Sequence, residues 1–167
     1  MNNNGVYPIQ STRSRVLALA AVAILVASFG LTRLAEAAGG QVTRGTFQTF
    51  AAGLGRGYDI SGLAVMVRTG SDMTLVSVKA AGLASNVSYP VHVHNQPCAV
   101  GSGGGHYQHV VGGDVDSINE IWPGFTTNVA GIGSGQARND FRARPEAQSI
   151  VIHDTDGARI ACADLHS

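Results

Sequence analysis

The side chains with the clearest chemical potential are histidines, and four of the six lie between residues 89 and 109. His92 and His94 alternate with two valines, and residues two apart in an extended strand point to the same face. His106 follows a glycine-rich loop that can fold it back towards this pair. Imidazole is a common ligand of transition metals. The spacing therefore predicts a metal site.

A second stretch near the C-terminus, SIVIHDTDGARIAC, complements the first. Ile150 and Ile152 alternate with His153, so His153 points away from the face that the isoleucines can bury. Taken alone, each histidine would more simply be structural or solvated. As a set, His92, His94, His106 and His153 are expected to converge outside a β core and to bind a metal.

Short strands joined by turns are expected to position these histidines. Strands are predicted at 58–68, 73–81, 126–133, 149–153 and 158–164, with a short one around 138–141 and a first strand or ordered arm within 39–57. Residues 69–72 and 154–157 have turn sequences. Beyond residue 38 no segment has a helical period. The pattern predicts one all-β domain, a sandwich or small barrel.

The N-terminus is typical of a secretory signal peptide, predicted over residues 1–38. A basic start is followed by an apolar run at 16–29, which is shorter than the roughly twenty residues that span a bilayer as a helix. The segment Ala35-Glu36-Ala37 fits the cleavage pattern. An uncleaved signal anchor is the alternative. We expect a secreted, periplasmic or cell-surface protein that has no membrane contact beyond this segment.

Charge and cysteine content narrow the function further. The formal net charge is +0, so nothing suggests nucleic acid or another polyanion as a partner. The two cysteines, Cys98 and Cys162, both lie in the exported part, where oxidation is favoured. Such a pair is most simply one disulfide. The alternative is two thiolate metal ligands, although neither cysteine has a CxxC partner.

Several motifs together resemble the copper/zinc superoxide dismutase family. They are YPVHVH, a following Cys98, GGGHY, and SIVIHDTDGARIAC, and the match runs in order from about Tyr58 to Leu165. The resemblance implies a Greek-key β-barrel or sandwich over 58–167, preceded by the signal helix and by an arm or first strand at 39–57. It also implies that Cys98 pairs with Cys162, as the cysteine count suggests independently.

Site residues carry over one at a time. His92, His94, His106 and His153 match the copper ligands of the family, and His106 also matches the histidine that bridges copper and zinc. Arg159 matches the arginine that guides the superoxide anion. These matches imply that Arg159 and His106 are catalytic. The alternative role for Arg159 is a surface salt bridge with Asp154 or Asp156.

The departures from the family pattern concern zinc. Only His109 follows His106 before His153, and only five residues separate His153 from Arg159. A full zinc site and the long charged loop of the family are therefore absent, as in its secreted copper-only branch. His109 is either structural, a partial zinc ligand or a neighbour of the ligands.

Without zinc, an acid must orient His106. Asp114, Asp116 and Glu120 are available, and Glu120 is favoured because Ile121 and Trp122 can anchor it.

These observations predict a secreted copper-dependent superoxide dismutase that converts superoxide to oxygen and hydrogen peroxide, with copper as cofactor and zinc unlikely. The alternative is a catalytically weak or inactive superoxide dismutase-like domain that binds copper or serves at a surface. The sequence gives no indication of an oligomeric state.

Overall fold

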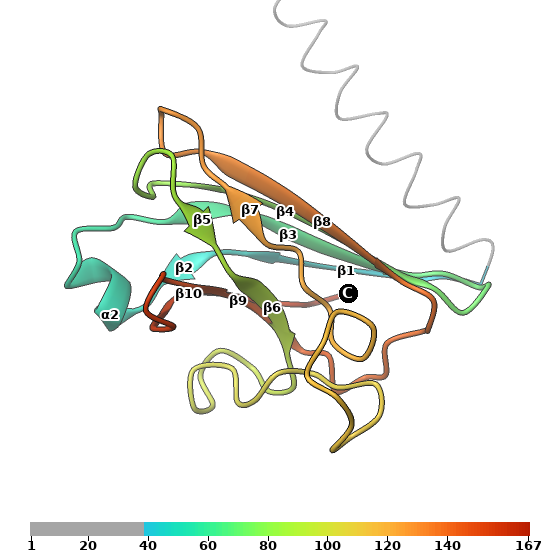
Figure 1. The fold of residues 1–167 in the computed structure, drawn as a ribbon. Helices are drawn as coiled ribbons and strands as arrows, with labels where there is room; N and C mark the ends of the chain where they lie inside the picture. The colour runs from blue at the N-terminus through green and yellow to red at the C-terminus, as the bar shows by residue number, and fades with distance from the viewer. Residues whose placement is uncertain (1–38) are drawn as a thin grey trace, which may run out of the picture. The chain divides into compact units, whose positions relative to one another are not determined.

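The computed structural model describes residues 39–167, so the predicted signal segment lies outside the described residues. Two antiparallel four-stranded sheets face each other (Figure 1). The first has the order β1 (Gln41–Thr46), β3 (Ser61–Arg68), β4 (Thr74–Ala81), β8 (Gly133–Asn139), and the second β2 (Gln48–Thr49), β10 (Arg159–Asp164), β9 (Ser149–His153), β6 (Val91–His94). A ribbon of β5 (Ser88–Tyr89) and β7 (Phe125–Thr126) and a short helix α2 (Ala51–Leu54) complete the described elements. The predicted all-β sandwich is confirmed.

Alternating apolar residues build the core between the sheets. On β3 and β4 the inward side chains are buried, among them Met66, Val76 and Val78, while their neighbours along each strand are more exposed. They share one apolar cluster with Val93 and Ile150 of the second sheet. Burial of one face fixes the strand register, because a slip by one residue would expose the whole apolar set.

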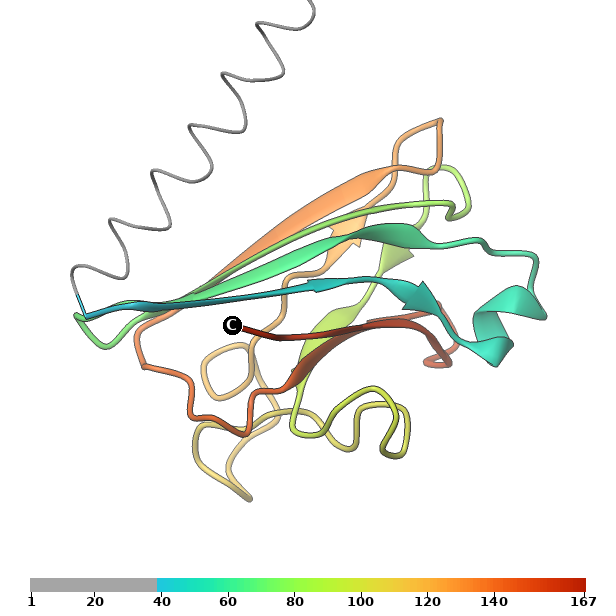
Figure 2. The same cartoon turned by 180° about the vertical axis from the view of Figure 1, so that it is seen from behind.

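The N-terminal segment joins both sheets. β1 pairs with β3, and β2 pairs with β10. α2 follows β2 and lies near the β9–β10 turn in both views (Figures 1 and 2). The loops after β6 lie on the outer side of the second sheet, away from the first (Figure 2). This arrangement leaves the outer side of β6 and β9 to be covered by loops rather than by core.

The prediction of a strand at 126–133 is wrong. Residues 127–132 form a turn in which Asn128 and Ile132 are joined by a backbone hydrogen bond, and Gly131 has a φ of 68°. The strand is instead β8, which contains the residues GSGQARN. Its inward positions carry no large apolar side chain because the preceding segment lies against them: a Cβ at Gly135 would sit 2.2 Å from the Pro123 carbonyl oxygen.

In the part of the chain that the structure describes, no helix is long and apolar enough to cross a membrane.

Candidate metal centre

Strand pairing brings three of the four predicted histidines together. β6 and β9 are antiparallel neighbours, with His92 opposite Val151 and His94 opposite Ser149, and His153 ends β9. His106 arrives from the glycine-rich loop and forms an isolated bridge with His94. Backbone hydrogen bonds on either side of His106 attach this segment to the end of β6.

The four imidazoles form one cluster. One ring nitrogen from each of His92, His94, His106 and His153 lies within 4.8 Å of the others. His94 and His153 are buried, and His92 and His106 are partly exposed. No carboxylate or thiolate belongs to the group.

The hydrogen bonds of the rings decide which nitrogens are free. Nδ1 of His94 is 3.3 Å from the Gly104 carbonyl oxygen, and Nδ1 of His153 is 3.1 Å from that of Gly157. A carbonyl only accepts, so each Nδ1 carries the proton and each Nε2 carries a lone pair. These two Nε2 atoms face each other at 3.2 Å. Two lone pairs at that distance repel, and a cation between them would relieve the repulsion.

The rings of His92 and His106 provide further nitrogen donors beside the Nε2 atoms of His94 and His153. Nδ1 of His92 is buried and has no hydrogen-bond partner among the described residues. Nδ1 of His106 is 2.8 Å from Oε2 of Glu120, which leaves Nε2 of His106 free. A buried polar atom without a partner is costly unless a metal or water satisfies it. The donor set therefore fits a transition-metal ion.

The electrostatics keep the rings of His92, His94 and His153 neutral. Burial, together with the neighbouring His106 and His153, lowers the pKa of His92 to about 4 and that of His94 to about 3. Burial also lowers the pKa of His153. A histidine must be neutral to bind a metal. These three rings are thus ready to bind a metal at neutral pH.

Glu120 is the acid that lies against His106, and its side chain is 2% exposed. Oε2 accepts hydrogen bonds from Nδ1 of His106 and from Nε1 of Trp122, both at 2.8 Å, and Oε1 accepts one from Gln108 at 3.2 Å. Burial raises the pKa of the Glu120 carboxyl, but these hydrogen bonds outweigh it and the pKa is lowered. Glu120 is therefore a carboxylate that orients His106.

Asp114, Asp116 and His109 are placed elsewhere. Asp116 accepts hydrogen bonds from the backbone of Ile118 and Asn119, and the Asp114 carbonyl accepts one from the Asn119 side chain, so both acids shape the loop before Glu120. The ring of His109 stacks on Phe141 with centroids 4.2 Å apart. None of the three belongs to the four-histidine group.

Arg159 lies beside the cluster. Its Nη1 donates to the carbonyl oxygens of Gly101, at 2.6 Å, and Ser102, at 3.3 Å. Its charge is close enough to contribute to the lowered pKa of His94 and His153. The salt bridge considered for Arg159 does not form, because Asp154 and Asp156 pair with Arg56 instead.

Sequence reasoning missed Trp122 as a member of the site. The sequence indicated only that it can anchor Glu120, which it does by donating its indole N–H to the carboxylate. Its ring also lies edge-on to that of His92, with centroids 5.6 Å apart. The position of Trp122 two residues after Glu120 was the feature of the sequence that could have indicated this role. The sequence held no signal for the Gly104 and Gly157 carbonyls that fix two of the rings, because backbone atoms are common to every residue.

The predicted disulfide is confirmed. Cys98 and Cys162 are bonded, with their Cα atoms 5.8 Å apart, so the alternative of two thiolate ligands is wrong. The bond ties the loop after β6 to β10. Both elements carry parts of the site, since the same loop provides the carbonyls that hold Arg159.

Comparison with solved structures identifies the fold. Superoxide dismutase 5 of Candida albicans, in its Cu(II) form, matches with a TM-score of 0.53 and 18% identity, covering 74% of this chain and 90% of that one. The chain has the fold of the copper/zinc superoxide dismutases. A glutamate-to-glutamine variant of the same enzyme matches with a TM-score of 0.53 and 18% identity, covering 74% and 89%.

The resemblance seen in the motifs is thus confirmed at the level of the superoxide dismutase fold. No protein-family profile matches the chain, and no curated protein sequence matches it. At 18% identity the structural likeness concerns the fold, and the activity has to be argued from the site.

Proposed function

We propose that this chain is a copper-dependent superoxide dismutase, acting outside the cytoplasm and converting two superoxide anions and two protons to oxygen and hydrogen peroxide. The observation that carries the proposal is the facing pair of Nε2 atoms of His94 and His153, 3.2 Å apart, completed by the free nitrogens of His92 and His106. On a superoxide dismutase fold, such a set supports a redox metal.

The donor set favours copper. Imidazole suits copper, and divalent copper binds a given set of nitrogen donors more tightly than the other first-row metals do. When bound by His92, His94, His106 and His153, copper would supply one-electron chemistry, accepting an electron from one superoxide and returning it to a second.

The residues around the cluster would handle the charge and the protons. Arg159 is always protonated, and a fixed positive charge beside the cluster attracts a small anion. Its hydrogen bonds to Gly101 and Ser102 use only Nη1, which leaves the other guanidinium donors for superoxide. His106, held at Nδ1 by Glu120, is the partly exposed ring best suited to pass a proton to the product.

We further propose that the protein works without zinc. A bridging histidine would need both ring nitrogens for metals, but Nδ1 of His106 is already bonded to Glu120. The orientation of His109 supports the same view, because its ring stacks on Phe141 rather than joining the cluster. Glu120 thus does by hydrogen bonding what a second metal would do by coordination.

An exported location fits this function. The Cys98–Cys162 disulfide is typical of an oxidising compartment. Together with the predicted signal peptide, it supports a secreted, periplasmic or cell-surface enzyme that removes superoxide there.

Replacing Arg159 tests the enzyme against the alternative of an inactive copper-binding domain. In Arg159→Ala with copper bound, we expect superoxide turnover to fall about tenfold or more, because one well-placed charge accelerates the capture of an anion by such factors. The loss should shrink at high salt. Arg138→Ala is the matched control, since Arg138 is an exposed arginine that forms an ion pair with Asp140 and does not contact the histidine cluster. If wild type and Arg159→Ala both bind copper but do not turn over superoxide, the inactive domain is the correct reading.

A further inference from the structure

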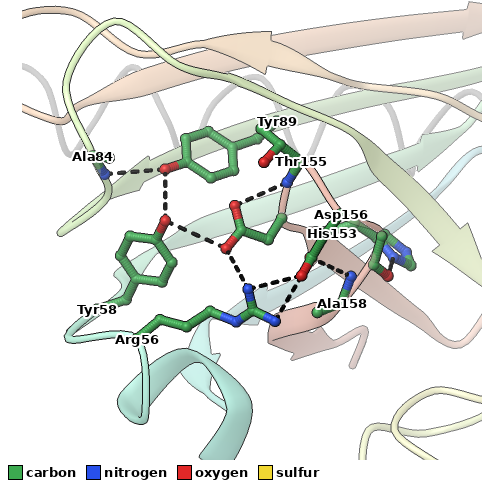
Figure 3. A network of polar contacts seen from close by, with 10 residues as sticks. Arg56, Tyr58, Ala84, Tyr89, His153, Thr155, Asp156 and Ala158 are labelled. Carbon is green, nitrogen blue, oxygen red and sulfur yellow. Dashed lines mark hydrogen bonds and ion pairs between the residues drawn. The ribbon is translucent and has the colours of Figure 1, made fainter.

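A polar network outside the histidine cluster connects the N-terminal segment to the turn between β9 and β10 (Figure 3). Nη1 of Arg56 donates to Oδ2 of Asp154 at 3.1 Å and to Oδ2 of Asp156 at 3.0 Å, and Nη2 donates to Asp156 at 2.9 Å. One guanidinium therefore joins both acids of the turn. A forked donor with fixed geometry constrains its partners more than a single charge does.

The inner end of the network reaches the core. Tyr58 donates to Oδ2 of Asp154 at 3.4 Å, Tyr89 donates to Tyr58 at 3.3 Å, and the Ala84 amide donates to Tyr89 at 3.1 Å (Figure 3). Tyr89 is 1% exposed. Asp154 is thus held from the core side by a tyrosine and from the solvent side by Arg56.

The turn between β9 and β10, to which Arg56 is hydrogen-bonded, contains a hydrogen-bond partner of His153. Gly157 closes the turn by donating its amide to the Asp154 carbonyl at 2.9 Å, and its own carbonyl faces Nδ1 of His153 at 3.1 Å. Asp156 also accepts the Ala158 amide, at 3.1 Å. Gly157 has a φ of 85°, which glycine adopts without steric cost, so the hydrogen bonds of the turn rather than its backbone conformation hold its carbonyl in place.

We propose that Arg56 is a positioning residue for the metal centre: by joining Asp154 and Asp156 it keeps the Gly157 carbonyl on Nδ1 of His153, and so presents Nε2 of His153 to the metal. The proposal rests on the proposed function, because it takes His153 as a ligand. Outer partners that fix the tautomer of a ligating histidine commonly change metal affinity when they are lost. No other arginine among the described residues makes an ion pair with this turn.

The tautomer of His153 can be measured without any metal. In the metal-free protein, ¹⁵N–¹H correlation spectra of the imidazole nitrogens should show His153 protonated at Nδ1. In Arg56→Gln we expect a second tautomer to appear. Asp156→Asn, which removes the carboxylate that pairs with Arg56, should have the same effect. Arg138→Gln removes an exposed arginine–aspartate pair at the end of β8 and should leave the His153 signals unchanged.

Copper provides the second readout. After loading with one copper per chain, Arg56→Gln should lose the metal to a chelator about tenfold faster than wild type, and its Cu(II) electron paramagnetic resonance spectrum should change. Unchanged His153 signals, copper loss and spectra in both Arg56→Gln and Asp156→Asn would overturn the proposal. If wild type itself binds no copper at the cluster, the proposed function fails, while the tautomer measurement still decides the role of Arg56.

Discussion

At the scale of single residues, Glu120 explains how a histidine can be held without a second metal. A buried carboxylate is costly unless its oxygens are hydrogen-bonded. Glu120 receives three hydrogen bonds, from His106, Trp122 and Gln108, and these satisfy both oxygens. The carboxylate in turn fixes the proton of His106 on Nδ1, so that Nε2 faces the cluster.

Glu120→Gln should slow superoxide turnover about tenfold while leaving copper bound, because an amide holds the imidazole less firmly than a carboxylate does. Turnover and copper content are measured on the same sample. Asp114→Asn is the matched control, since this substitution removes one negative charge from the same loop and Asp114 does not contact His106. His109→Ala should also change turnover little. Loss of copper in Glu120→Gln would mean that Glu120 holds the fold of the site rather than the orientation of His106.

The metal-free protein should lose stability as the pH falls below about 6.5, the ordinary pKa of histidine in an unfolded chain. His92 and His94 have folded pKa values lowered to about 4 and about 3. Between these values and 6.5 the unfolded chain binds more protons, so protonation favours unfolding. Each histidine contributes at most about 1.4 kcal/mol per pH unit.

Urea unfolding of the metal-free protein over a series of pH values measures this slope. His94→Asn should make it shallower, because one of the three histidines with lowered pKa values is then missing. An equal slope in wild type and His94→Asn would show that acid destabilisation comes from other groups.

At the scale of elements, the loop from 101 to 105 is as important as the strands. Gly103 has a φ of 99°, and a Cβ there would lie 2.9 Å from Cγ2 of Val151 and 3.3 Å from Nδ1 of His94. The loop therefore passes close to β6 and β9 because Gly103 has no side chain. This approach places the Gly104 carbonyl on His94.

Gly103→Ala should destabilise the protein by about 2 kcal/mol, because it combines an unfavourable φ with a steric clash. It should also weaken copper binding by displacing the Gly104 carbonyl. Gly105→Ala is the matched control: Gly105 has an ordinary φ, and its nearest neighbour would be 3.7 Å away. Chemical unfolding of the two variants checks the difference. Equal stabilities would contradict the close approach.

The strands that carry the site could be predicted, since their patterns are local. The segment 149–153 alternates isoleucine with other residues, and the structure has β9 over the same residues. β8 was predicted only at its end, around 138–141, because its inward positions are Gly133, Gly135, Ala137 and Asn139, which leave no apolar period. Their small size is required by the chain segment that packs on them. The Arg56 network likewise depends on residues about 100 positions apart, which no local pattern reveals.

At the scale of the whole molecule, the site lies on the outer side of one sheet of the sandwich and is completed by loops. The disulfide from Cys98 to Cys162 closes a separation of 64 residues and fastens the largest of these loops to β10. The core between the sheets holds β6 and β9 in register. Three of the four clustered histidines therefore come from strands β6 and β9, while His106 and the carbonyls that hold two of the rings come from loops.

The most direct test is the decay of superoxide in the presence of purified protein that carries one copper per chain and no zinc. We expect the protein to accelerate decay in proportion to its concentration, added zinc to leave the rate unchanged, and His153→Ala to abolish the acceleration. Copper bound at one per chain without any acceleration, or acceleration that depends on bound zinc, would show that the protein is not a copper-only superoxide dismutase.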